Sequence, residues 1–79
     1  MIKVYDNGGE TFDRYTIVLM DCPEHGGLFA CYCMSENPRS GVGGHASCQV
    51  GSHLGKLIDI DMLPRECREV LIQMEYIKR

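Results

Sequence analysis

The C-terminal stretch carries an apolar stripe at helical spacing. Apolar residues recur there at intervals of three and four, at Leu63, Cys67, Val70, Leu71, Met74 and Ile77. Charged and polar residues fill the positions between them, and this arrangement is typical of a helix with one buried face. Pro64 suits the first helical position, and Glu66 suits the positive end of the helix dipole. We therefore predict an amphipathic helix over residues 64–78.

The residues upstream favour β-structure. Residues 2–5 alternate apolar and polar side chains and run into Asp6-Asn7-Gly8-Gly9, which is typical of a tight turn. Residues 13–20 are strong strand formers that are apolar on both faces, so they predict a central strand. Residues 28–34 predict a third strand, antiparallel to the second because the connection is too short for a crossover helix. Shorter strands are predicted at 47–50 and 56–60.

These elements predict an α+β fold. At 79 residues the chain has room for one core, so residues 1–79 are expected to form a single domain. We expect a small, mostly antiparallel sheet of three to five strands, with the C-terminal amphipathic helix packed on one face. Residues 35–44 concentrate Gly, Pro, Ser and Asn, and this longest irregular segment is predicted to be mobile.

Charge and hydropathy limit the kinds of partner and the cellular location that we expect. The net charge is −3 and no run of Lys and Arg occurs, which argues against nucleic acid and favours a basic protein partner. The longest apolar run, residues 15–20, is too short for a membrane span, and residues 1–3 lack a signal-peptide core. A cytoplasmic location is expected, with the five cysteines reduced. An unpaired edge strand would allow a homodimer.

Two pairs of metal-binding residue types are spaced like zinc ligands. Cys22 and His25 are three residues apart, and so are His45 and Cys48. A CxxH and HxxC set of this kind can hold zinc tetrahedrally, so a zinc-stabilised domain is the alternative function. Buried thiols and surface histidines explain the same residues and are favoured. No cofactor is therefore expected, with zinc as the exception to test.

The cysteine and histidine residues do not indicate catalysis. Cys22 and His25 are neighbours in sequence, but a nucleophilic pair needs a thiol beside an imidazole and a third orienting group. A third reading, an enzyme or nucleotide binder, would use Asp13, Arg14, His53 and Lys56. The glycine-rich segments lack the Gly-Lys-Ser/Thr ending of a phosphate-binding loop, so this reading ranks below the other two.

Three segments carry a resemblance to known proteins. Residues 4–16, VYDNGGETFDRYT, resemble the opening of a family of small uncharacterised proteins of bacteria and their phages. Residues 34–38, MSENP, and residues 53–56, HLGK, followed by Leu63-Pro64 ahead of the helix, are similar to the other two landmarks of that family, in the same order. The resemblance implies a phage or mobile-element setting. The family has no established activity, so no mechanism comes with it.

Together these observations predict a small protein-binding module, a phage or prophage accessory protein that acts on a host or defence protein. The polar and glycine-rich turns of the three segments are the expected binding surface. The predicted binding residues are Asp6, Asn7, Gly8, Gly9, Asp13, Arg14, Ser35, Asn37, His53 and Lys56.

Overall fold

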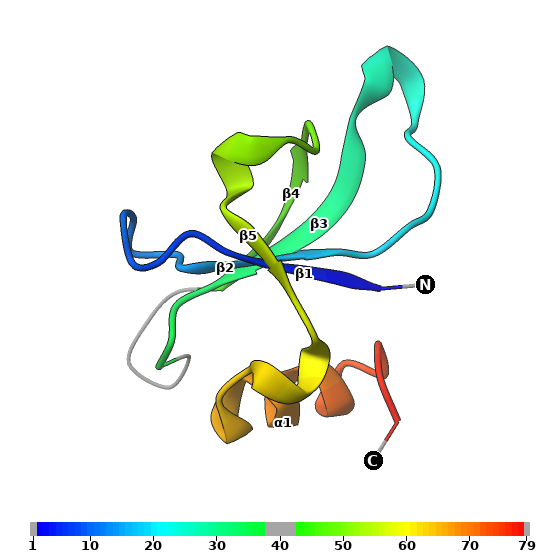
Figure 1. Cartoon of the computed structure of the whole chain (residues 1–79). Coiled ribbons are helices and arrows are strands. Elements are labelled where there is room, and N and C mark those ends of the chain that lie inside the picture. Colours follow the sequence, from blue (N-terminus) through cyan, green and yellow to red (C-terminus); the bar gives the residue numbers. More distant parts are fainter. Residues whose placement is uncertain (1, 38–42, 79) are drawn as a thin grey trace.

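The computed structural model describes residues 2–37 and 43–78, and it shows one five-stranded sheet with a helix at its C-terminal end (Figure 1). The strands are β1 (Lys3–Asp6), β2 (Tyr15–Val18), β3 (Phe29–Met34), β4 (Gly44–Cys48) and β5 (Lys56–Ile58). Their spatial order is β4-β3-β2-β1-β5, and every neighbouring pair is antiparallel. The predicted α+β fold with an antiparallel sheet and a C-terminal helix is confirmed.

Strand β2 lies at the centre of the sheet, as its apolar sequence predicts. All four of its residues are buried. Ile17 faces the helix side with its neighbour Val4 on β1, whereas Val18 lies on the other face opposite Cys31 on β3. Because both faces of this strand are covered, its sequence shows a nearly continuous apolar run instead of a clean alternation.

The core lies between the sheet and the helix α1 (Arg65–Gln73). The sheet contributes Val4, Tyr15, Ile17 and Met34, and the C-terminal stretch contributes Leu63, Cys67 and Leu71. The predicted stripe is therefore confirmed at the positions that face the sheet. Burying one such side chain contributes about 1.5–3 kcal/mol, so this cluster is the main source of stability.

The helix is shorter than predicted, because it ends at Gln73 and not at residue 78. Glu75 adopts a left-handed conformation, with φ +64°. Its N–H donates to the Ile72 carbonyl, and the Tyr76 N–H donates to the Leu71 carbonyl. These two hydrogen bonds form a Schellman motif, which ends the helix. The chain then turns, so that Tyr76 and Ile77 pack against the core. Ile77 therefore continues the apolar spacing because it packs against the core, although its backbone is not helical.

The two shorter strands that the sequence predicts, at 47–50 and 56–60, are wrong in their bounds, and β2 is shorter than the predicted 13–20. The strand predicted at 47–50 is β4, at Gly44–Cys48, because pairing with β3 recruits Gly44 and His45. The strand predicted at 56–60 ends at Ile58, since Ile60–Met62 form a 3₁₀ turn. Further 3₁₀ turns occur at His25–Gly27 and Ser52–Leu54. Of the irregular segment predicted at 35–44, residues 38–42 lie outside the described residues.

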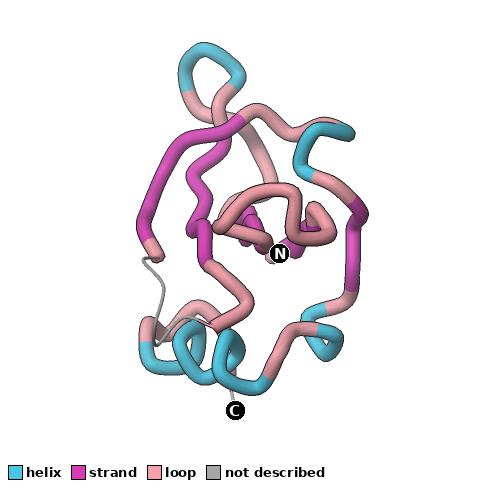
Figure 2. The backbone as a smooth tube through the Cα atoms, turned by 90° about the vertical axis from the view of Figure 1, so that its left-hand side faces the viewer, coloured by secondary structure: helices cyan, strands magenta, loops and turns pink. Residues whose placement is uncertain are grey.

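The view along the sheet shows how the edges are placed. In Figure 2 the sheet is curved, with β5 between its two 3₁₀ turns on one side, β3 and β4 on the other, and α1 across the lower end. Strands β4 and β5 are the two edges of the sheet. Across residues 2–37 and 43–78, no helix has the length and apolarity that crossing a bilayer requires.

Gly55 is the glycine on which the packing of β5 depends. Its φ is +97°, and a Cβ there would lie 2.1 Å from the Asp6 carbonyl oxygen and 2.5 Å from the Asn7 Cα. Gly8 also has a positive φ, +78°, but a Cβ there would meet nothing within 4 Å. Only glycine therefore allows β5 to approach the end of β1.

These two glycines make a matched pair of variants. Gly8→Ala should cost about 1–2 kcal/mol of unfolding free energy, the backbone cost alone. Gly55→Ala should cost at least about 2 kcal/mol more, because the clash is with backbone atoms that cannot rotate away. Chemical denaturation of both variants measures the difference. Equal costs would show that β5 does not depend on this close approach.

Candidate functional site

The antiparallel topology brings parts of residues 4–16, 34–37 and 53–56 to one end of the sheet. Asp6, the last residue of β1, pairs with Tyr15 at the start of β2 and with Lys56 at the start of β5. Tyr15 in turn pairs with Met34, the last residue of β3. We call this place the motif end of the sheet. Segments far apart in sequence therefore share one surface region.

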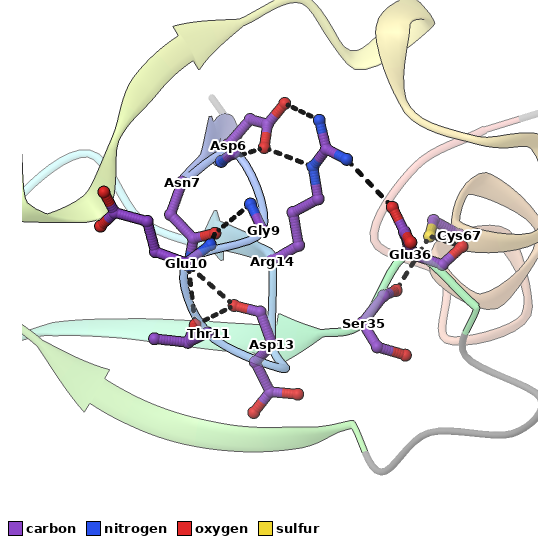
Figure 3. A network of polar contacts seen from close by, with 11 residues as sticks. Asp6, Asn7, Gly9, Glu10, Thr11, Asp13, Arg14, Ser35, Glu36 and Cys67 are labelled. Atoms are coloured by element: carbon purple, nitrogen blue, oxygen red, sulfur yellow. Dashed lines mark hydrogen bonds and ion pairs between the residues drawn. The ribbon is translucent and has the colours of Figure 1, made fainter.

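The β1–β2 loop at the motif end is held together by the side chain of Asn7 (Figure 3). Its Oδ1 accepts hydrogen bonds from the N–H groups of Gly9, at 2.8 Å, and Glu10, at 3.1 Å. Its Nδ2 donates to Thr11 Oγ1, at 2.7 Å, and to the Asp13 carbonyl, at 3.3 Å. The Asn7 side chain thus satisfies backbone groups of the loop that have no strand partner, as Asn does in Asx turns.

Asp6 and Arg14 close the base of the same loop. Arg14 Nε donates to Asp6 Oδ1 at 2.7 Å, and Arg14 Nη2 donates to Asp6 Oδ2 at 3.0 Å. This is the fork geometry that makes an arginine–carboxylate pair strong. The Gly8 N–H also donates to Asp6 Oδ1, at 2.8 Å. The Arg14 guanidinium therefore holds the pKa of the Asp6 carboxyl below its usual value, with the Gly8 N–H and the charge of Lys56 acting in the same direction.

The remaining arginine nitrogen links the loop to the end of β3. Arg14 Nη1 donates to Glu36 Oε2 at 3.0 Å. Glu36 follows Ser35, whose carbonyl accepts a hydrogen bond from Cys67 Sγ on α1 at 3.4 Å. Hydrogen bonds thus run from the β1–β2 loop through Arg14 to residues 35–36, and from there to the helix.

Phe12 is the one large apolar side chain that this loop exposes. It is 70% exposed, although the residues around it are fixed by hydrogen bonds. A cleft of about 450 Å³ opens beside it. The lining of this cleft consists of Gly9, Glu10, Thr11, Phe12, Arg14, Ser35, Glu36 and Asn37. We call it the loop cleft.

Most of the predicted binding residues build the motif end. Asp6, Asn7 and Arg14 use their side chains on the loop itself, as described above. The Ser35 side chain is buried and its hydroxyl donates to the Asn37 carbonyl at 2.9 Å. Asp13 has a buried Oδ1 that meets no partner among the described residues, while its carbonyl accepts from Asn7 and Thr11.

The predicted residues from the third segment lie on the β5 side of the motif end. Lys56 is exposed and sits opposite Asp6 in the sheet register. His53 belongs to the 3₁₀ turn Ser52–Leu54 and does not line the loop cleft. Neither residue lines the loop cleft, although Lys56 lies beside Asp6 at the base of the loop.

The four zinc candidates lie on three parts of the fold, with His45 and Cys48 both on β4. Cys22 is exposed in the β2–β3 connection, His25 begins a 3₁₀ turn, and Cys48 ends β4. The His45 imidazole is hydrogen bonded through Nε2 to the Tyr76 hydroxyl, and its ring packs edge-on against Tyr32, with centroids 5.0 Å apart. The described residues contain no group of three or more His, Cys, Asp or Glu arranged to hold a metal ion. The five cysteines are free thiols.

Sequence reasoning passed over Phe12, Glu10 and Glu36. All three lie in residues 4–16 or 34–38, where the predicted binding residues are the turn formers and their polar neighbours. A signal was available for Phe12, because it is a lone aromatic among turn formers and fits no strand alternation.

Neither a family model nor a curated protein nor a solved structure matches this chain. The geometry of the motif end is therefore the basis for assigning a function.

The Asp6–Arg14 pair predicts a specific acid dependence. The lowered pKa of Asp6 means that its stabilising effect is complete above the unfolded value, near 3.8, and is lost as pH falls from there through the folded pKa. Asp6→Asn should cost about 1 kcal/mol at neutral pH and should remove this part of the acid dependence. Denaturant unfolding of both proteins between pH 2 and pH 7 measures the effect.

The control for this experiment is Glu24→Gln, which changes an exposed carboxylate in the β2–β3 connection. Its unfolding free energy should follow the wild-type curve at every pH. If the difference between wild type and Asp6→Asn stays constant down to pH 2, the ion pair does not contribute as described.

Proposed function

We propose that this chain is a small protein-binding module that contacts its partner through Phe12 and the loop cleft. The observation that carries the proposal is a 70% exposed aromatic side chain on a loop fixed by its own hydrogen bonds. Buried aromatic anchors dominate the energy of many protein interfaces. Phe12 has the chemistry and the position of such an anchor.

The order within the loop supports this function in a second way. A flexible loop would lose conformational entropy on binding, and that loss would reduce affinity. Here Asn7 and the Asp6–Arg14 pair hold the loop in the absence of a partner. Binding through Phe12 can therefore use most of the free energy gained by burying the ring, about 1.5–3 kcal/mol.

The arrangement of Arg14 disfavours an enzyme or nucleotide binder at the same site. An anionic substrate would need guanidinium donors directed at it. Three nitrogens of Arg14 already donate to carboxylates, two bonds to Asp6 and one to Glu36. A phosphate would have to displace those partners, so a protein surface fits the site better.

A homodimer through a sheet edge is supported less well. Strand β5 has three residues and β4 has five. Short edge strands are one means by which proteins restrict edge-to-edge pairing. We therefore place the binding surface at the loop cleft, and a second copy of the chain is the lesser candidate for the partner.

The biological setting that we propose rests on the resemblance of residues 4–16, 34–38 and 53–56 to a family of bacterial and phage proteins. In that setting the module is a phage or prophage accessory protein acting on a host or defence protein in the cytoplasm. Five free thiols suit a reducing compartment.

Affinity capture from a bacterial lysate tests the proposed function. Immobilised wild-type protein should retain a partner, and Phe12→Ala should weaken that binding about 10- to 100-fold, because the ring supplies the anchor. The matched control is Leu57→Ala on β5, which removes another exposed apolar side chain, 56% exposed, away from the loop cleft.

Thermal melts should show all three proteins folded, since both substitutions are at exposed positions. Capture that is equal for wild type and Phe12→Ala would contradict the proposal. So would repeated capture of nothing above background.

A further inference from the structure

The loop cleft has a charge character that identifies the kind of side chain it can accept. Its ionisable lining residues are Glu10, Arg14 and Glu36. Two carboxylates and one guanidinium therefore surround the space beside Phe12. The balance among them decides whether a cation or an anion is attracted.

The positive charge of Arg14 is largely neutralised before any ligand arrives. Asp6 occupies two of its nitrogens in a fork, and the side chains of Arg14 and Asp6 are only 31% and 19% exposed. Asp6 does not line the cleft, so it neutralises the charge of Arg14 without adding its own carboxylate to the cleft lining. The cleft is left with the negative charge of Glu10 and Glu36.

Glu36 is held in place for this role. Arg14 Nη1 binds only one of its two carboxylate oxygens, Oε2, at 3.0 Å. Its side chain is 64% exposed, so water and a ligand can reach the carboxylate. An oriented carboxylate with one oxygen bound by Arg14 has a second oxygen, Oε1, that can accept a strong hydrogen bond from a charged donor.

Phe12 completes the site on the apolar side. An aromatic face attracts an ammonium or guanidinium group within about 6 Å of its centroid, and the aliphatic stem of Lys or Arg packs on the ring. A purely apolar ligand would take the Glu10 and Glu36 carboxylates out of water without offering them a new hydrogen-bond donor, which carries a desolvation cost. A cationic side chain satisfies both the ring and the carboxylates.

We infer that the loop cleft binds a Lys or Arg side chain flanked by apolar residues in an exposed segment of the partner protein. This inference rests on the proposed function, because it describes what the Phe12 surface recognises. Arg14 acts here as a positioning residue for Glu36, and Glu36 makes the contact. The negative net charge of the whole chain, −3, favours approach of the same kind of partner.

Selection from a displayed library of random 12-residue peptides tests the inference without knowledge of the natural partner. Immobilised wild-type protein is the bait, and peptides that also bind Phe12→Ala are removed. The enriched peptides should carry Lys or Arg next to an apolar residue. One such peptide is then synthesised, and its dissociation constant is measured by fluorescence anisotropy.

Glu36→Gln should raise the dissociation constant of that peptide about 5- to 10-fold, as should replacing its cationic residue with Gln. The two changes together should have little further effect, because they remove the same contact. Glu24→Gln, which removes a carboxylate outside the cleft, should leave the constant unchanged. Raising the salt concentration should weaken the wild-type complex.

The possible failures separate the two claims. Phe12-dependent peptides without cationic residues, or peptides insensitive to Glu36→Gln, would overturn the inference and leave the proposed function standing. A library that yields no peptide dependent on Phe12 would overturn both.

Discussion

The ion pair between Asp6 and Arg14 is the interaction on which the motif end depends. It joins the last residue of β1 to the residue before β2, and its two hydrogen bonds, at 2.7 and 3.0 Å, close the loop between them. The same arginine fixes Glu36 at the end of β3, and the same aspartate lies beside Lys56 of β5. Ion pairs exposed to water contribute little to stability, but this one is partly buried and forked, so it determines the local geometry.

Sequence patterns were sufficient for the architecture because burial sets them. The apolar stripe at Leu63, Cys67 and Leu71 and the two-sided apolar run of β2 each report directly on a covered face. The errors occur where another interaction decides. The helix ends at Gln73 because Glu75 adopts a left-handed turn, and β4 begins at Gly44 because β3 offers unpaired backbone groups. Neither cause leaves a periodic signal.

The predicted binding residues Gly9, Arg14, Ser35 and Asn37 line the loop cleft, whereas Phe12, Glu10 and Glu36 were not among the predicted residues. Residues 4–16, 34–37 and 53–56 meet at the motif end because the antiparallel topology pairs Asp6 with Tyr15 and Lys56, and Tyr15 with Met34. Polar side chains such as Asn7 and Asp6, however, satisfy the backbone and one another, so they shape the surface from within. Phe12 protrudes because those bonds are made. A sequence shows which residues can hydrogen bond, but the choice between an internal and an external partner depends on the folded geometry.

The central claim is that the β1–β2 loop is ordered in the free protein, so that Phe12 is presented in one position. Backbone ¹⁵N relaxation of the free protein measures this order directly. The hydrogen bonds of Asn7 predict order parameters at Gly9, Glu10 and Phe12 close to those of rigid strands, about 0.85. Values below about 0.6 at these residues would contradict the account.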